Sequence, residues 1–176
     1  MTVDALFALL LEARRLCGHS RYVVIGSLSV LGVSTVAAIP VDMTMSIDAD
    51  CYALLDPGRT LDLQHDLGEG SAFHRKHGIY LDPVNPKLPT LPDQWESRLI
   101  SVERDGVVAL FLEPHDAAVS KLARGEERDI RWVRAGARSH ILSLATVALR
   151  MKTANFLDSQ EEDRALAVLE RLRSEL

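Results

Sequence analysis

The chain has 176 residues, of which 47% are apolar and 26% charged, a composition ordinary for a globular protein. A chain of this length forms one domain, or one domain with a helical extension. It can bury roughly 70% of its unfolded surface, so it does not need disulfide bonds or structural metal ions to be stable. The net charge of −5 argues against broad, non-specific nucleic-acid binding, although it leaves room for a local basic groove that holds one RNA.

The first predicted elements are a helix and a buried strand. Apolar residues spaced by three and four predict a helix over 3–17, with Gly18 as its C-cap. The β-rich run Tyr22–Ile25 predicts a short buried strand. Cys17 and Cys51 are far apart in the sequence and lack metal-binding spacing, which indicates two buried thiols in a reduced, cytoplasmic protein.

A tight turn, Gly26-Ser27, interrupts a long uncharged segment. The serine is well placed to cap a buried helix over 28–36, and residues 37–43 then form a connection. The twenty residues from Tyr22 to Val41 carry no charge and are long enough to span a bilayer. Their small and hydroxyl residues, the closing Pro40 and the lack of an aromatic belt favour a strand, a turn and a buried helix, so we expect no membrane association.

The run Met45–Leu54 predicts a second strand with two acidic residues on one face. Side chains at i and i+2 of a strand share a face, so Asp48 and Asp50 project together. The other face is predicted to carry Met45, Ile47, Ala49 and Cys51. Asp56-Pro57-Gly58 predicts a turn, and residues 60–68 predict a helix that ends at a glycine.

A strand, a loop and a hairpin are predicted next. Ile79–Asp82 is a short strand stopped by a proline, and residues 83–95 hold four prolines and are expected to form an extended surface loop. The apolar runs Leu99–Glu103 and Val107–Leu112 flank Asp105-Gly106, a dipeptide typical of hairpin turns.

The last third of the chain is predicted to be helical. Pro114 suits the first position of a helix over 115–124. Further helices are expected at 126–136, 139–152 and 160–175. In the last of them, Ser159 and Glu162 match a capping box, and leucines at 166, 169, 172 and 176 form the apolar stripe. The order of the elements predicts an α/β (α+β) fold with a core over 1–113 and a helical region over 114–176 packed on it.

Asp48 and Asp50 are the main candidates for a functional site. Two carboxylates on one strand face can hold a hard cation such as Mg²⁺, which takes oxygen ligands and also binds substrate phosphates. A two-metal phosphoryl-transfer site usually needs a third carboxylate. Asp82 and Glu113 both follow predicted strands, and we favour Asp82 because an extended loop comes after it. The alternative is a solvated sheet face, although aspartate is depleted in strands.

Two basic residues on a later helix are further candidates. Lys121 and Arg124 share one helix face, and if this face is directed at the carboxylates, they would neutralise a triphosphate. The alternative is an exposed charged face with ordinary ion pairs among Glu126, Glu127 and Arg128.

Four segments, in this order, resemble a known family. They are Val24–Gly32, Ser46–Asp50, Phe73–Asp82, and Leu112–Asp116 with Lys121–Arg124 and Arg128-Asp129. Gly26-Ser27 followed by Asp48-Ala49-Asp50 resembles the signature of the nucleotidyltransferase fold shared with DNA polymerase beta. More specifically, the chain resembles bacterial nucleotidyltransferase-like proteins of unknown function that are related to the nucleotidyltransferase toxins of type IV toxin–antitoxin systems.

The resemblance implies a nucleotidyltransferase-like mixed sheet that carries a metal site. Asp48 and Asp50 would hold Mg²⁺. Asp82 would complete the metal site and help to deprotonate the attacking hydroxyl.

The resemblance also implies a phosphate site. Backbone N–H groups of the Gly26-Ser27 turn and the serine hydroxyl would hold the nucleotide phosphates. Lys121 matches a phosphate-binding lysine of related toxins, with Arg124 beside it, and Asp129 matches an aspartate that these toxins need.

We therefore expect an enzyme that uses Mg²⁺ to transfer a nucleotidyl group from an NTP to an acceptor. The acceptor would be an RNA such as a tRNA end, a protein side chain or a small molecule, and a co-encoded partner protein is an expected companion. The alternative is a catalytically inactive nucleotide-binding or antitoxin-like module. A third hypothesis is a structural interaction protein whose carboxylates merely face solvent.

Overall fold

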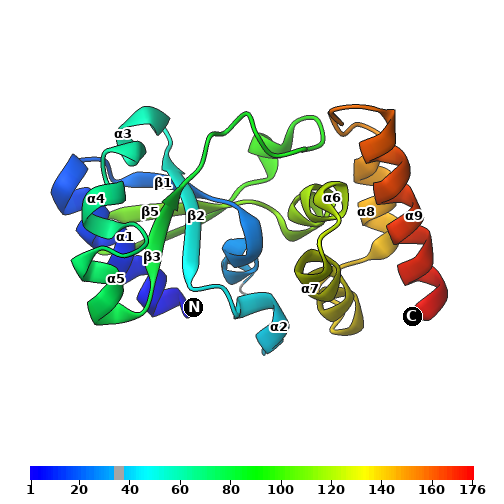
Figure 1. Cartoon of the computed structure of the whole chain (residues 1–176), viewed down its shortest axis with the longest axis horizontal. Helices are drawn as coiled ribbons and strands as arrows, with labels where there is room; N and C mark the ends of the chain where they lie inside the picture. The colour runs from blue at the N-terminus through cyan, green and yellow to red at the C-terminus, as the bar shows by residue number, and fades with distance from the viewer. Residues whose placement is uncertain (34–37) are drawn as a thin grey trace.

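A mixed five-stranded sheet forms the centre of the fold. The computed structural model describes residues 1–33 and 38–176, and the strands lie in the order β3-β2-β1-β5-β4. Their bounds are Arg21–Val24 (β1), Asp48–Ala53 (β2), Tyr80–Pro83 (β3), Ile100–Arg104 (β4) and Val107–Phe111 (β5). Strand β1 is parallel to β5 and β2 to β3, whereas β1–β2 and β4–β5 are antiparallel. The predicted mixed sheet flanked by helices is therefore confirmed (Figure 1).

The two faces of the sheet pack against different helices because side chains alternate along β1. Tyr22 and Val24 join a hydrophobic cluster with helix α1 (Val3–Cys17). Val23 points the other way and joins a cluster that includes residues of the C-terminal helices. Helix α1 has the predicted bounds, and Gly18 adopts the predicted left-handed C-cap conformation with φ of 79°.

The segment after β1 differs from the predicted capped helix. Residues Gly26–Gly32 form a 3₁₀ helix, η1, whose N-cap is Ile25. Ser27 does not cap it, because the serine hydroxyl instead accepts a hydrogen bond from a lysine of a distant helix. The predicted residues 34–36 lie outside the described part of the chain. The predicted connection contains a short helix, α2 (Val41–Thr44), although its residue 37 also lies outside the described part.

Strand β2 is shorter than predicted. It begins at Asp48 because its neighbour β3 begins only at Tyr80, which pairs with Asp48. Met45 and Ile47 were predicted to lie within the strand, on the face opposite the aspartates. They instead precede it and are 61% and 48% exposed.

The region between β2 and β4 is partly as predicted. The predicted turn is the start of helix α3 (Pro57–Leu61), because the Asp56 side chain accepts a hydrogen bond from Arg59 N–H and caps the helix. The single helix predicted over 60–68 is divided between α3 and α4 (Gln64–Leu67). A further helix, α5 (Ala72–His77), precedes β3. Pro83 is the last residue of β3. The loop after it was predicted to be extended and on the surface, but it contains turns and bends at 86–89 and 93–94, and residues 90–92 are buried; a 3₁₀ turn, η2 (Trp95–Arg98), follows it.

The C-terminal elements follow their local signals. The hairpin β4–β5 turns at Asp105 and Gly106, both with positive φ, as this dipeptide predicts. The helices are α6 (Pro114–Arg124), α7 (Glu127–Arg138), α8 (Leu144–Met151) and α9 (Ser159–Glu175), and Figure 1 shows them gathered at one side of the sheet.

Three details of these helices differ from the prediction. Helix α8 begins at Leu144 because Ser143 caps it. Helix α9 is capped by Asp158 instead of the predicted serine, and the Asp158 side chain accepts a hydrogen bond from Glu161 N–H. The leucines at positions 166 and 176 of the predicted stripe are 40% and 51% exposed. Across the described ranges 1–33 and 38–176, no helix combines the length and apolar character that a membrane span requires.

Candidate active site

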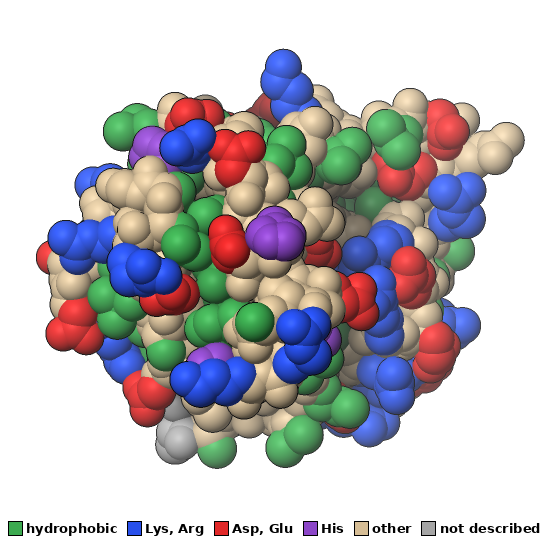
Figure 2. Space-filling view, turned by 60° about the vertical axis from the view of Figure 1, so that its left-hand side comes forward, with side chains coloured by type: hydrophobic (Ala, Val, Ile, Leu, Met, Phe, Trp, Pro, Cys, Tyr) green, Lys and Arg blue, Asp and Glu red, His purple; other side chains and the backbone are tan. Residues whose placement is uncertain are grey.

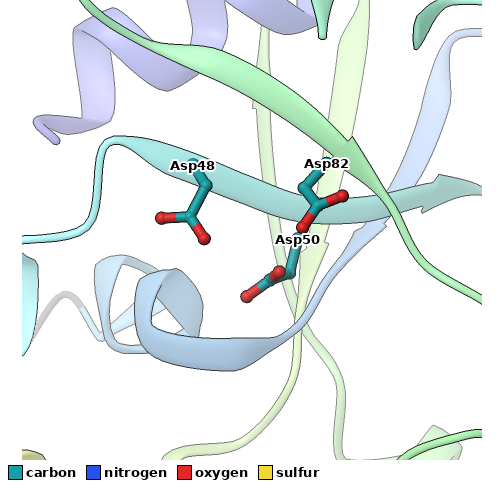
Figure 3. Close-up of side chains that lie close together, drawn as sticks. All are labelled: Asp48, Asp50 and Asp82. Atoms are coloured by element: carbon teal, nitrogen blue, oxygen red, sulfur yellow. The ribbon is translucent and has the colours of Figure 1, made fainter. Parts of the chain in front are cut away.

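Three aspartates from two neighbouring strands converge at one edge of a cavity. Asp48 and Asp50 lie on β2, and Asp82 lies on β3 directly opposite Asp50 in the parallel register. One carboxylate oxygen from each lies within 4.8 Å of the other two, and Figure 3 shows the side chains directed to the same region. Strand alternation brings the first two together, and strand pairing adds the third.

Glu113, the other candidate for a third carboxylate, has a structural role elsewhere. Its side chain caps α6 by accepting a hydrogen bond from His115 N–H. The same carboxylate contacts the His115 Nδ1 at 2.6 Å. The structure therefore brings Asp82, and not Glu113, to Asp48 and Asp50.

The negatively charged carboxylates of the three aspartates repel one another. Burial, followed by the charges of Asp48 and Asp82, raises the pKa of Asp50 to about 7. Burial and the charge of Asp48 also raise the pKa of Asp82 above its ordinary value. The Asp48 carboxylate accepts a hydrogen bond from the Ser46 hydroxyl. A cluster with this excess of negative charge, made only of oxygen donors, suits a hard divalent cation.

The Gly-Ser turn lies directly beside this cluster. Gly26 has φ of 66°, and a Cβ atom added to it would be 2.0 Å from the Asp50 Oδ2 atom. Only glycine therefore lets the carboxylate approach the backbone at this point. The sequence showed a small residue here, but it did not show that Asp50 is the side chain that needs the space.

The predicted cationic residues lie beside the turn, where both are hydrogen-bonded to Asp129. The Lys121 side chain, with the residue only 3% exposed, donates hydrogen bonds to Ser27 Oγ and to Asp129 Oδ1, each at 2.9 Å. Arg124 Nε donates to Asp129 Oδ2 at 2.6 Å and remains half-exposed. Burial lowers the pKa of Lys121 despite the nearby Asp129. Burial alone would raise the pKa of Asp129, but the Arg124 hydrogen bond and the Lys121 charge hold it below its ordinary value.

A cavity of about 400 Å³ joins the aspartates to a row of arginines. Its lining includes Ser27, the three aspartates and the side chains of Arg124, Arg128 and Arg131. Arg131 was not among the residues predicted from the sequence. Arg128 was expected in a segment that carries the family resemblance or, as the alternative, in an exposed charged face; its ion pair with Glu126 at 2.7 Å agrees with that alternative. The spacing of three residues between Arg128 and Arg131 was the signal available, because it puts both on one face of α7. Figure 2 shows blue Lys and Arg side chains gathered toward the right of the view, with red acidic ones among them.

The site therefore combines groups for two kinds of ligand. Its three carboxylates can hold a metal ion, and the adjoining arginines and the Gly-Ser turn offer positive charge and N–H donors to an anion.

Comparison with known proteins agrees with this chemistry. A family model described as nucleotidyltransferase of unknown function (DUF6036) matches residues 4–173. No curated protein and no solved structure matches the chain.

Proposed function

The chain belongs to this family of nucleotidyltransferases, and we propose that it transfers a nucleotidyl group from an NTP to an RNA, protein or small-molecule hydroxyl with the aid of Mg²⁺. The observation that carries the proposal is the convergence of Asp48, Asp50 and Asp82 within 4.8 Å beside an arginine-lined cavity. Enzymes that transfer phosphoryl groups depend mainly on positioning and charge stabilisation, and this site offers groups for both.

The three aspartates are the proposed metal ligands. Burial, followed by repulsion from Asp48 and Asp82, raises the pKa of Asp50 to about 7, which supports this role because a bound cation would offset the cost of the buried negative charge. When bound, the ion supplies charge neutralisation at the phosphate that is transferred.

The proposed phosphate site is the turn at Gly26 and Ser27 together with Lys121 and Arg124. Gly26 of the turn lies beside Asp50. The Lys121 ammonium donates a hydrogen bond to the Ser27 hydroxyl oxygen at 2.9 Å. Asp129 fixes both cationic side chains by hydrogen bonds, so its proposed role is to position them. Arg128 and Arg131 would extend the positive charge toward the far phosphates.

The acceptor must lose a proton as it attacks. A carboxylate oxygen of the triad is the proposed proton acceptor, with Asp82 as the expectation from sequence and Asp50 as the second candidate. Both have pKa values raised toward the neutral range, where a general base is most effective.

The test is incubation with α-labelled NTPs, Mg²⁺, and cellular RNA or protein. We expect label on an acceptor with the parent chain, no label with Asp50→Ala, and retained labelling with the control Glu113→Gln. Failure to label any acceptor, together with nucleotide binding that is insensitive to Mg²⁺ removal, would favour the inactive nucleotide-binding or antitoxin-like module.

The resemblance to toxin nucleotidyltransferases extends the proposal to a biological role. A toxin of a toxin–antitoxin pair would arrest growth when its expression is induced, and Asp50→Ala would abolish the arrest. Growth unaffected by an actively labelling parent chain would reject the toxin role while leaving the transfer reaction intact.

A further inference from the structure

A second cavity, of about 330 Å³, also has Asp50 in its lining. Its walls come from the loop after β3, from α6 and from the start of α9, and they include Asn85, Thr90, Ser120 and Glu161. Building on the proposed transfer reaction, we infer that this cavity binds the acceptor, and that Glu161 selects an acceptor carrying an amino group.

The two cavities differ in their charged residues. Arg128 and Arg131 line the first cavity and not the second, whereas Glu161 lines the second and not the first. Gly26, Lys121 and Arg124, which belong to the proposed phosphate site, also line the second cavity. The phosphate that is transferred therefore lies where the cavities meet, at Asp50 and Arg124, which line both. The first cavity also holds Asp42, Asp48 and Asp82, so a polyphosphate fits it together with a cation bound at the aspartates, whereas Glu161 gives the second cavity a partner for an amino group.

The geometry of phosphoryl transfer assigns a role to each cavity. The attacking and leaving oxygens lie roughly in line, on opposite sides of the transferred phosphorus. With the pyrophosphate group among the arginines of the first cavity, the acceptor hydroxyl enters from the second. Asp50 lines both cavities, whereas Asp82 lines only the first. An acceptor in the second cavity therefore contacts Asp50 and not Asp82.

Glu161 is built into the wall of the second cavity. The residue is only 8% exposed, and its Oε2 atom accepts hydrogen bonds from the Thr90 hydroxyl at 3.0 Å and from Leu157 N–H at 2.8 Å. These two hydrogen bonds fix the orientation of the carboxylate, and both are accepted by the same oxygen. The other oxygen, Oε1, receives no hydrogen bond from the described residues and is available to a ligand.

The lining defines the chemical class of the acceptor. A carboxylate oxygen without another hydrogen-bond partner accepts from an N–H donor, and apolar side chains such as Val84 and Leu112 provide surface for a ring. The volume lies at the small end of ligand sites, so the cavity takes a group about the size of one nucleoside or one sugar. The shared chemistry is a hydroxyl for Asp50 and an amino group for Glu161, found in an amino-bearing nucleoside or an amino sugar.

The reaction is balanced without a further reactant. The acceptor oxygen forms a bond to the α-phosphorus, and the bond from that phosphorus to the bridging oxygen of the β-phosphate breaks. Pyrophosphate leaves with the electron pair, and the acceptor proton passes to the Asp50 carboxylate.

The experiment compares two pairs of probes that differ by an amino group: adenosine with purine riboside, and glucosamine with glucose. Binding to the full chain is measured by NMR titration, and transfer from α-labelled NTPs is measured on the same probes. Glu161→Gln keeps a side-chain oxygen for Thr90 and Leu157 but turns the group facing the cavity from an acceptor into a donor. Glu162→Gln is the matched control, because it makes the same change at the exposed neighbouring residue.

We expect the amino-bearing probe of at least one pair to bind about 10- to 100-fold more tightly, as for a hydrogen bond to a charged group. Adenosine preference would identify a nucleoside acceptor, and glucosamine preference an amino sugar. Glu161→Gln should abolish the preference without changing the NTP affinity or the melting temperature, and Glu162→Gln should preserve it.

Equal binding within both pairs, binding of no probe, or a preference that survives Glu161→Gln would overturn the inference. Transfer to other acceptors under those outcomes would leave the proposed function standing. Conversely, a Glu161-dependent preference without transfer from any NTP would retain the amino-binding cavity and reject the transfer reaction.

Discussion

Replacing Asp50 with asparagine is expected to stabilise the protein when no divalent cation is present. The carboxylate is largely buried, faces Asp48 and Asp82, and sits against the backbone of Gly26. Asparagine keeps nearly the same shape and removes the charge. We therefore expect Asp50, which is proposed to be essential for activity, to lower the stability of the metal-free protein.

The size of the effect follows from the pKa of Asp50, which rises from 3.8 to about 7. At about 1.4 kcal/mol per pH unit, the ionised carboxylate costs the folded state up to about 4 kcal/mol. Water in the cavity screens part of this cost, so we expect a gain of about 1–2 kcal/mol for Asp50→Asn. For a chain of this size the melting temperature would rise by roughly 2–8 °C.

The effect must depend on pH with a defined sign. Because the folded pKa of Asp50 lies above the unfolded value, the unfolded chain loses this proton first as the pH rises. The penalty is absent below the unfolded pKa, grows between about pH 4 and 7, and is complete above the folded pKa. The advantage of Asp50→Asn should therefore be larger at pH 8 than at pH 5.

Thermal unfolding in a chelator at pH 5 and pH 8 measures this difference. Asp66→Asn, at an exposed position on α4, is the matched control and should show little change. Adding Mg²⁺ should stabilise the parent chain more than the Asp50→Asn variant and so reduce the difference between their melting temperatures. An advantage of Asp50→Asn that is absent at pH 8, or larger at pH 5, would refute the charge-repulsion reasoning.

Three further predictions test the surroundings of the triad. Gly26→Ala should abolish stabilisation by Mg²⁺ in thermal melts, because the added Cβ would lie 2.0 Å from a triad carboxylate oxygen; Gly18→Ala has a similar positive φ but no atom within 4 Å, and it should retain the effect. Asp129→Ala leaves a buried lysine unpaired and should lower the unfolding free energy by about 3 kcal/mol in urea titrations; a loss below about 1 kcal/mol would contradict the ion pair. Asp82→Asn should abolish Mg²⁺ binding by calorimetry and Glu113→Gln should not, whereas the reverse result would exchange their roles.

Elements with strong local signals were predicted well. The helix over 3–17 has its apolar spacing and its glycine cap, and the hairpin at Asp105-Gly106 has its turn dipeptide. Pro114 begins α6 as expected. Weaker local patterns failed where distant contacts decided the conformation. Ser27 was expected to cap a helix, but its hydroxyl is taken by Lys121, which lies 94 positions later in the chain.

For the candidate site, the sequence by itself determined the pairing of Asp48 with Asp50, because the strand period of two requires it. It also indicated the Gly-Ser turn and the face shared by Lys121 and Arg124. These are relations within single elements, where spacing alone sets the direction of the side chains.

Only the tertiary structure decided which residues from other elements complete the site. The parallel register of β2 and β3 brings Asp82 opposite Asp50, while Glu113 is engaged as a helix cap. The contact of Gly26 with Asp50 and the position of Glu161 beside a second cavity have no local signature. They depend on strand pairing and helix packing between segments far apart in the chain, which residue spacing does not encode.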